Sequence, residues 1–155
     1  MKLKEVKNNY VHYFLDENGF KQGEYKNYHF DGQLQLHCYF KDNKKHGECK
    51  EYDEDGQLWI HYFYKDDKKH GEFKLYNPNG KLYIHCYNKD DKRHGECKKY
   101  YEDGSLYNHS YYKDGELHGE YKSYYSSGKL SNTKYYSNGK DITEMYKKLK
   151  VWKSL

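Results

Sequence analysis

The chain has 155 residues, and its 28 Lys and Arg residues against 24 Asp and Glu residues leave a formal net charge of +4. This near balance excludes the strongly basic surface of a histone-like nucleic-acid binder. The longest apolar runs are only a few residues long, which excludes a membrane-spanning helix, while 22 tyrosines and the low net charge argue against disorder.

The first ten residues contain no apolar stretch, so we expect no signal peptide. The expected location is therefore cytoplasmic. In that reducing compartment, cysteines are expected as thiols.

A glycine followed by Glu returns every 24 residues, five times without insertion or deletion. Lys, Tyr, a second Gly and Leu recur at fixed offsets behind each of these glycines. Such a period is typical of a repeat protein whose units stack on their neighbours. The glycines are Gly23, Gly47, Gly71, Gly95 and Gly119, and the leucines are Leu34, Leu58, Leu82, Leu106 and Leu130.

Each unit predicts two short strands. In the second unit the first strand covers residues 47–52, a turn follows at Asp55 and Gly56, and a longer strand covers residues 57–65. Asp-Gly is typical of hairpin turns in which both central residues adopt positive φ. A polar loop, Lys-Asp-Asp-Lys-Lys-His-Gly, then returns the chain. We therefore expect an all-β fold, an elongated single-layer antiparallel sheet of tandem 24-residue β-hairpins over residues 1–140.

Residues 141–155 predict a C-terminal helix. Asp141 and Glu144 have the spacing of a capping box. We expect an amphipathic helix that caps the last strand, because an exposed strand edge invites aggregation. A basic helix that binds a membrane or a partner is the alternative. The apolar stripe at helical spacing consists of Ile142, Met145, Leu149 and Trp152.

The pattern His-Gly-Glu-x-Lys-x-Tyr-x-x-Asp-Gly-x-Leu resembles the variant form of the MORN (membrane occupation and recognition nexus) repeat over residues 8–140. The resemblance implies a scaffold that binds other proteins. The variant repeats also resemble those of bacterial antitoxin or immunity proteins and of giant viruses of amoebae. The Lys-rich, Ala-free composition indicates an AT-rich genome, which fits such viruses and some bacteria equally. A viral origin would imply the host cytoplasm. The second glycine of the standard repeat is replaced here by Tyr25, Cys49, Phe73, Cys97 and Tyr121.

Two ladders of histidines run along the array. Equivalent residues in successive units lie two strands apart, or roughly 10 Å, which is too far to share a zinc ion. We therefore expect no metal and no cofactor. One ladder is expected to be half-buried and the other to help close the loops. The first is His37, His61, His85 and His109, and the second is His46, His70, His94 and His118.

The cysteines form two pairs, each flanking one returning loop, and we expect the members of a pair to face each other across a hairpin. Two interpretations stay open: thiols packed beside bulky neighbouring pairs, or cross-strand disulfides. The pairs are Cys38/Cys49 and Cys86/Cys97, and the corresponding pairs in other units are Phe14/Tyr25, Tyr62/Phe73 and Ser110/Tyr121.

Alternation along the longer strand predicts a core face and an aromatic–histidine face. In the second unit Leu58, Ile60, Tyr62 and Tyr64 would form the core face. Tyr and Trp are common anchors in protein interfaces, so the other face is the candidate partner-binding surface. The alternative is that long Lys stems cover this face and no ligand is involved. The candidate residues are Tyr39, Trp59, His61, Phe63, Tyr83, His85, Tyr87, Tyr107 and Tyr111.

The sequence contains no recognisable nucleophile–base pair, phosphate-binding loop or unrepeated acidic pair, so we expect no enzyme. The leading function is a non-enzymatic protein-binding scaffold, with an antitoxin-type inhibitor as the alternative. Self-association through the terminal strands is a further partnership that we consider. Nucleic acid is not expected with a single arginine. Anionic lipid is a weaker alternative, because aspartates adjoin the basic pairs Lys44/Lys45, Lys68/Lys69 and Lys92/Arg93.

Overall fold

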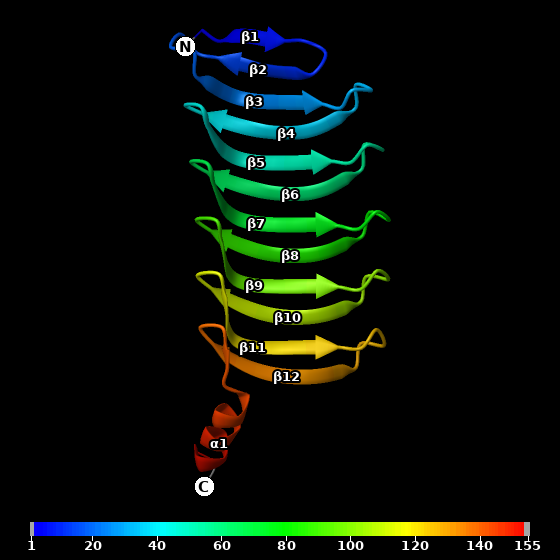
Figure 1. Ribbon diagram of the computed structural model, residues 1–155, viewed down its shortest axis with the longest axis vertical. Coiled ribbons are helices and arrows are strands. Elements are labelled where there is room, and N and C mark those ends of the chain that lie inside the picture. The colour runs from blue at the N-terminus through cyan, green and yellow to red at the C-terminus, as the bar shows by residue number, and fades with distance from the viewer. Residues whose placement is uncertain (1, 154–155) are drawn as a thin grey trace.

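The computed structural model describes residues 2–153 as one open antiparallel sheet of 13 strands, followed by a single helix. The strands pair in chain order, so the sheet is a continuous meander (Figure 1). The expected all-β, single-layer repeat fold is confirmed. The elements are β1 (Lys4–Lys7), β2 (Val11–Leu15), β3 (Lys21–Tyr28), β4 (Leu34–Lys41), β5 (Lys44–Tyr52), β6 (Leu58–Lys65), β7 (Lys68–Tyr76), β8 (Leu82–Lys89), β9 (Lys92–Tyr100), β10 (Leu106–Lys113), β11 (Glu116–Tyr124), β12 (Leu130–Ser137), β13 (Lys140–Asp141) and α1 (Thr143–Lys153).

The loops that return the chain between hairpins are tighter than expected. Each is a two-residue turn in which both residues have positive φ, as in a type I′ hairpin, for example 51° at Asp66 and 66° at Asp67. The first strand of the unit therefore starts earlier than expected, at Lys44 rather than Gly47. The turns are Asp42–Asn43, Asp66–Asp67, Asp90–Asp91, Asp114–Gly115 and Asn138–Gly139.

The Asp-Gly turns have a different geometry from the one expected. In the turn between β5 and β6 only Gly56 has positive φ, and Asp55 does not. The turn is closed by Asp53, whose Oδ1 accepts hydrogen bonds from the backbone N–H groups of Asp55 and Gln57. The expectation of two positive φ values at these turns was therefore wrong, because an Asx-type loop replaces a two-residue turn.

The type I′ turns also join each unit to the one before it. The Asp67 N–H donates to the Lys45 carbonyl at 3.0 Å, and the Lys45 N–H donates back to Asp67 Oδ1 at 2.8 Å. The same reciprocal pair links Asn43 with Lys21 and Asp91 with Lys69. We call this contact the turn clip. It satisfies backbone groups where two successive hairpins meet.

One face of the sheet contains the core and is here called the cysteine face. Its most buried residues are 8% exposed or less, although no second layer of the described residues covers them. Bulky side chains beside them, including Phe40, Phe73 and Tyr112, supply the packing. The buried residues are Cys38, Cys49, Tyr62, Ile84, Cys86, Cys97, Asn108 and Ser110.

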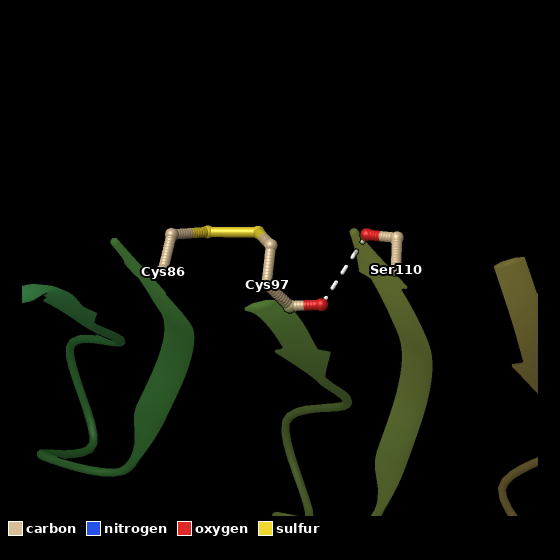
Figure 2. The surroundings of a disulfide bond; sticks show 3 residues. All are labelled: Cys86, Cys97 and Ser110. Atoms are coloured by element: carbon tan, nitrogen blue, oxygen red, sulfur yellow. Dashed lines mark hydrogen bonds between the residues drawn. A yellow bond between two sulfur atoms is a disulfide. The ribbon is translucent and has the colours of Figure 1, made fainter. Parts of the chain in front are cut away.

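The cysteine pairs face each other as expected: Cys38 lies opposite Cys49, and Cys86 lies opposite Cys97. The second pair is a disulfide, with Cα atoms 4.1 Å apart, whereas the first pair consists of free, buried thiols. Figure 2 shows the disulfide beside Ser110, whose hydroxyl donates to the Cys97 carbonyl. Both interpretations of these pairs are therefore represented in one molecule.

The expected pair of Phe14 with Tyr25 was wrong. Tyr13 lies opposite Tyr25, and the Phe14 ring instead contacts His12 on the other face. The reason is the longer turn that follows β2, closed by a hydrogen bond from the Asp16 N–H to the Phe20 carbonyl. It moves the register by one residue, which exchanges the two faces.

A β-bulge near the start of each longer strand changes the face on which the first residues of that strand lie. Leu58 lies opposite Tyr52, but Ile60 lies opposite Glu51, so Trp59 is an extra residue. Because cross-strand partners share a face, Leu58 lies with Tyr52 on the side away from the cysteines. The expectation that Leu58 belongs to the core face was therefore wrong, while Ile60, Tyr62 and Tyr64 lie there as expected.

The C-terminal helix α1 continues the long axis of the array beyond β12 (Figure 1). Asp141 accepts hydrogen bonds at its start, but from Thr143 rather than from Glu144 as a capping box requires. Tyr146 stacks on Tyr135, with ring centroids 3.8 Å apart. Met145 and Leu149 are 55% and 56% exposed, so the helix covers less of the sheet end than expected. The side chain of Trp152 lies outside the described residues.

Among the described residues, α1 is too short and too polar to cross a membrane.

Candidate functional site

The face opposite the cysteines carries a repeated group of Glu, Lys and His and is here called the histidine face. In the second unit, Glu48 accepts from Lys50 Nζ at 2.8 Å, and its other oxygen lies 2.9 Å from His61 Nε2. The His side chains are 15–23% exposed, which confirms that this ladder is half-buried. The groups are Glu24/Lys26/His37, Glu48/Lys50/His61, Glu72/Lys74/His85 and Glu96/Lys98/His109.

These contacts change the ionisation of the Glu residues. The Lys50 hydrogen bond, with a smaller contribution from His61, holds the pKa of the Glu48 carboxyl below its usual value. The same cause lowers the pKa of Glu24, Glu72 and Glu96. Each carboxylate thus has a Lys partner on its own strand and a His partner on the next strand.

Four of the candidate aromatic residues lie on this face, and each packs against a histidine of a Glu–Lys–His group. The ring centroids are 5.0–5.3 Å apart. We call these residues the Tyr39 row. Their rings are partly exposed but already engaged by the fold. The contacts are His37–Tyr39, His61–Phe63, His85–Tyr87 and His109–Tyr111.

The second histidine ladder lies at the type I′ turns. His46 Nδ1 lies 3.2 Å from Asp66 Oδ1 in the next turn, and His70 and His94 make the same contact with Asp90 and Asp114. These histidines thus contact the turn of the following unit, whereas the expectation was that each helps to close its own loop. Across residues 2–153, no three His, Cys, Asp or Glu side chains converge in a geometry suited to a metal ion.

The other three candidate aromatics lie on the cysteine face, because of the bulge. Tyr107 shows this placement: it lines a hollow with Tyr121 and Ser123, which pair with Ser110 and Asn108 of the core. Trp59 likewise lines a hollow with Leu36 and Glu51. The expected single stripe is therefore two rows on opposite faces. We call Trp59, Tyr83 and Tyr107 the Trp59 row.

Three neighbouring hollows follow the Trp59 row along the Asx-turn side of the sheet. The first, of about 570 Å³, contains Trp59, which is 50% exposed. It shares Asn77 and Pro78 with a second hollow of about 440 Å³ that contains Tyr83. The second shares Tyr101 and Tyr107 with a third of about 350 Å³. Together they form a groove, here called the turn-side groove.

One residue of each basic pair that could bind anionic lipid lies on the cysteine face. Lys45 Nζ lies over the Tyr64 ring at 5.1 Å, and Lys69 lies over Tyr62 at 5.2 Å. The Arg93 guanidinium takes the same position over Tyr112. These cation–π contacts leave one outward Lys of each basic pair, and it lies opposite a second exposed Lys across the turn, beside the turn aspartates. The contacts weaken the case for a lipid-binding edge.

The turn-side groove was missed in the sequence, although one signal was present. Residues equivalent to Glu51 change in every unit, being Asn27, Leu75, Lys99 and Ser123 elsewhere. A carboxylate at this position therefore breaks the repeat.

Comparison with family models matches five segments of the chain to the model described as MORN repeat variant: residues 21–42, 45–66, 69–89, 93–114 and 117–138. Each segment holds one hairpin and ends at or near a type I′ turn. A comparison with curated proteins found no match.

Proposed function

Because the chain belongs to the MORN repeat variant family, whose repeats are generally protein- or lipid-binding modules, we propose that it is a non-enzymatic scaffold that binds a partner protein along the turn-side groove. The observation that carries this proposal is the Trp59 row. Its three aromatic side chains are 39–50% exposed and lie beside concave surface.

The geometry of the row suits a protein segment. Equivalent residues are two strands apart, so Trp59, Tyr83 and Tyr107 span roughly 20 Å along the array. Trp and Tyr provide large, rigid contact area with a polar tip, which is why they dominate interface hot spots. The Tyr39 row, by contrast, packs on the histidines, and we assign it a structural role.

The experiment is an affinity pull-down with quantitative mass spectrometry from the native cell, using two matched triple variants. One is Trp59→Ala, Tyr83→Ala, Tyr107→Ala in the groove. The other is Tyr39→Ala, Tyr87→Ala, Tyr111→Ala on the histidine face. Both are first shown to be folded by circular dichroism.

We expect a partner that is retained by wild type and by the histidine-face variant and lost with the groove variant. Equal recovery with all three proteins would remove the groove from the proposal. Loss with the histidine-face variant alone would move the interface to the other side of the sheet.

A further inference from the structure

We propose that the first hollow of the turn-side groove binds an arginine side chain of the partner protein, held between the Glu51 carboxylate and the Trp59 indole. This inference rests on the proposed function, because the arginine belongs to the partner protein that binds the groove. It specifies where one contact with that partner lies and which side chains make it.

The carboxylate of Glu51 has different partners from that of Glu48. Glu48, only three residues earlier in β5, has both carboxylate oxygens engaged by Lys50 and His61. Glu51 lies on the opposite face, half-buried beside Leu36 and Ile60. Among the described residues its hydrogen-bond partner is the Tyr62 hydroxyl, and no cation forms an ion pair with it.

Tyr62 gives Glu51 a hydrogen bond but no positive charge. Tyr62 is 3% exposed, and its burial, reinforced by the hydrogen bond to Glu51, raises the pKa of its hydroxyl above the ordinary value. The phenol therefore stays a neutral donor to one carboxylate oxygen. A half-buried carboxylate with one neutral donor gains from a cation more than a solvated one does.

The other charged groups around the hollow do not supply that cation. Lys45 also lines it, but its ammonium lies over the Tyr64 ring. Asp53 and Glu54 add two further carboxylates. The hollow therefore holds three acidic side chains against one engaged ammonium, which makes it complementary to a positive ligand group.

Trp59 determines which cation fits. The indole is the best of the aromatic faces for a cation–π contact, and Trp59 is 50% exposed and lines the hollow. A guanidinium can stack on an indole and donate to a carboxylate at the same time, whereas an ammonium is a compact, strongly hydrated point charge. The combination of Trp59 with Glu51 occurs in this unit alone among the five.

The continuity of the groove points to a protein as the source of the cation. The hollow shares Asn77 and Pro78 with the next one, so a chain that places a side chain beside Glu51 can continue toward Tyr83. A free small cation would use none of that surface.

The test is a titration followed by ¹⁵N nuclear magnetic resonance, with acetyl-Gly-Arg-Gly-amide as the probe and its uncharged citrulline analogue as the control peptide. The Trp59 indole N–H and the Glu51 amide are the reporters. Three variants are compared with wild type: Glu51→Gln, Trp59→Leu and Glu102→Gln. Gln at position 51 keeps an acceptor for Tyr62, and Glu102 is a matched acidic residue of another turn.

We expect the arginine peptide to shift both reporters and the citrulline peptide to leave them unmoved. Glu51→Gln should raise the Kd about fivefold to tenfold, Trp59→Leu by a similar factor, and Glu102→Gln by less than about twofold. Equal shifts from both peptides, an unchanged Kd in Glu51→Gln, or no shift from the arginine peptide would each overturn the inference.

The outcome separates this inference from the proposed function. Peptide binding at Glu51 together with an unaffected pull-down would leave the cation site standing and overturn the groove as the partner surface. A pull-down lost with the groove variant, without peptide binding, would support the groove and overturn the cation site.

Discussion

The two faces of the sheet are built by the same strands but differ in how strictly they repeat. On the histidine face, four successive units carry the same Glu, Lys and His contacts at nearly the same distances. On the cysteine face, the position of Cys38 is occupied in later units by Tyr62, Cys86 and Ser110. Residues that recur in every unit hold the units together, and residues that change give each unit a different local surface.

The largest loss of stability is expected from a substitution in the packed core of the cysteine face. Tyr62→Ala opens a cavity at a 3% exposed site beneath Tyr64 and Phe73. We expect it to lower the free energy of unfolding by about 3–5 kcal/mol. Tyr39→Ala on the histidine face, where the ring is partly exposed, should cost no more than about 1 kcal/mol. Urea denaturation measures both, and equal losses would contradict the assignment of the core to the cysteine face.

The thiol pair provides the next test. Cys38→Phe combined with Cys49→Phe places two bulky rings beside Tyr62, where the pattern of large and small pairs leaves room for thiols only. We expect a loss of about 1–3 kcal/mol from overpacking, measured by thermal and urea unfolding. The double Ala variant is the control for loss of the thiols. Unchanged stability in the Phe variant would show that the packing interpretation is wrong.

Acid should destabilise the sheet through the glutamates of the histidine face. The folded-state pKa values of Glu24, Glu48, Glu72, Glu96 and Glu120 lie below the ordinary 4.5, because a Lys donates to each. A lowered pKa contributes stability that is present above pH 4.5 and is lost as the pH falls through the folded value. We expect the free energy of unfolding to decline below about pH 4.5, measured by urea titration at several pH values. A flat profile between pH 5 and pH 3 would contradict the prediction.

A single substitution on the histidine face should have the smallest effect. Glu48→Gln removes the charge that engages Lys50 and His61 but keeps the shape. Because the carboxylate is about one-third exposed, we expect a loss of only about 0.5–1 kcal/mol at neutral pH. The variant should also show a shallower acid decline than wild type. A loss as large as that of Tyr62→Ala would mean that the ion pairs, rather than the packing, dominate the unit.

The sequence was sufficient to predict the units, the all-β sheet and the opposed cysteines, because these depend on period and alternation alone. It was not sufficient to predict the position of Trp59. Simple alternation places Trp59 with His61, but the ladder between β5 and β6 contains one more residue on the β6 side. A bulge depends on how the turn closes, here through Asp53, and that choice has no single-residue signature.

A second bulge was detectable in principle. Lys41 lies opposite Lys44 across the type I′ turn, while Cys38 lies opposite Cys49, so β5 holds two more residues than β4 over this stretch. Gly47, whose φ is 101°, lies within the surplus. The Gly that recurs in all five units is therefore explained by a backbone conformation that a side chain rarely adopts. Its recurrence within the surplus predicts the bulge.

The turn clip has a consequence for the evolution of the molecule. Asp67 reaches back to Lys45 with a backbone and a side-chain hydrogen bond, and Asp91 reaches back to Lys69 in the same way. Each of these 24-residue segments thus carries the turn of one clip and the Lys to which the next turn binds. A duplicated segment would join without any change to its neighbours and would lengthen the array by roughly 10 Å. The separation between the two ends of the sheet is therefore a quantity that gene duplication can adjust in fixed steps.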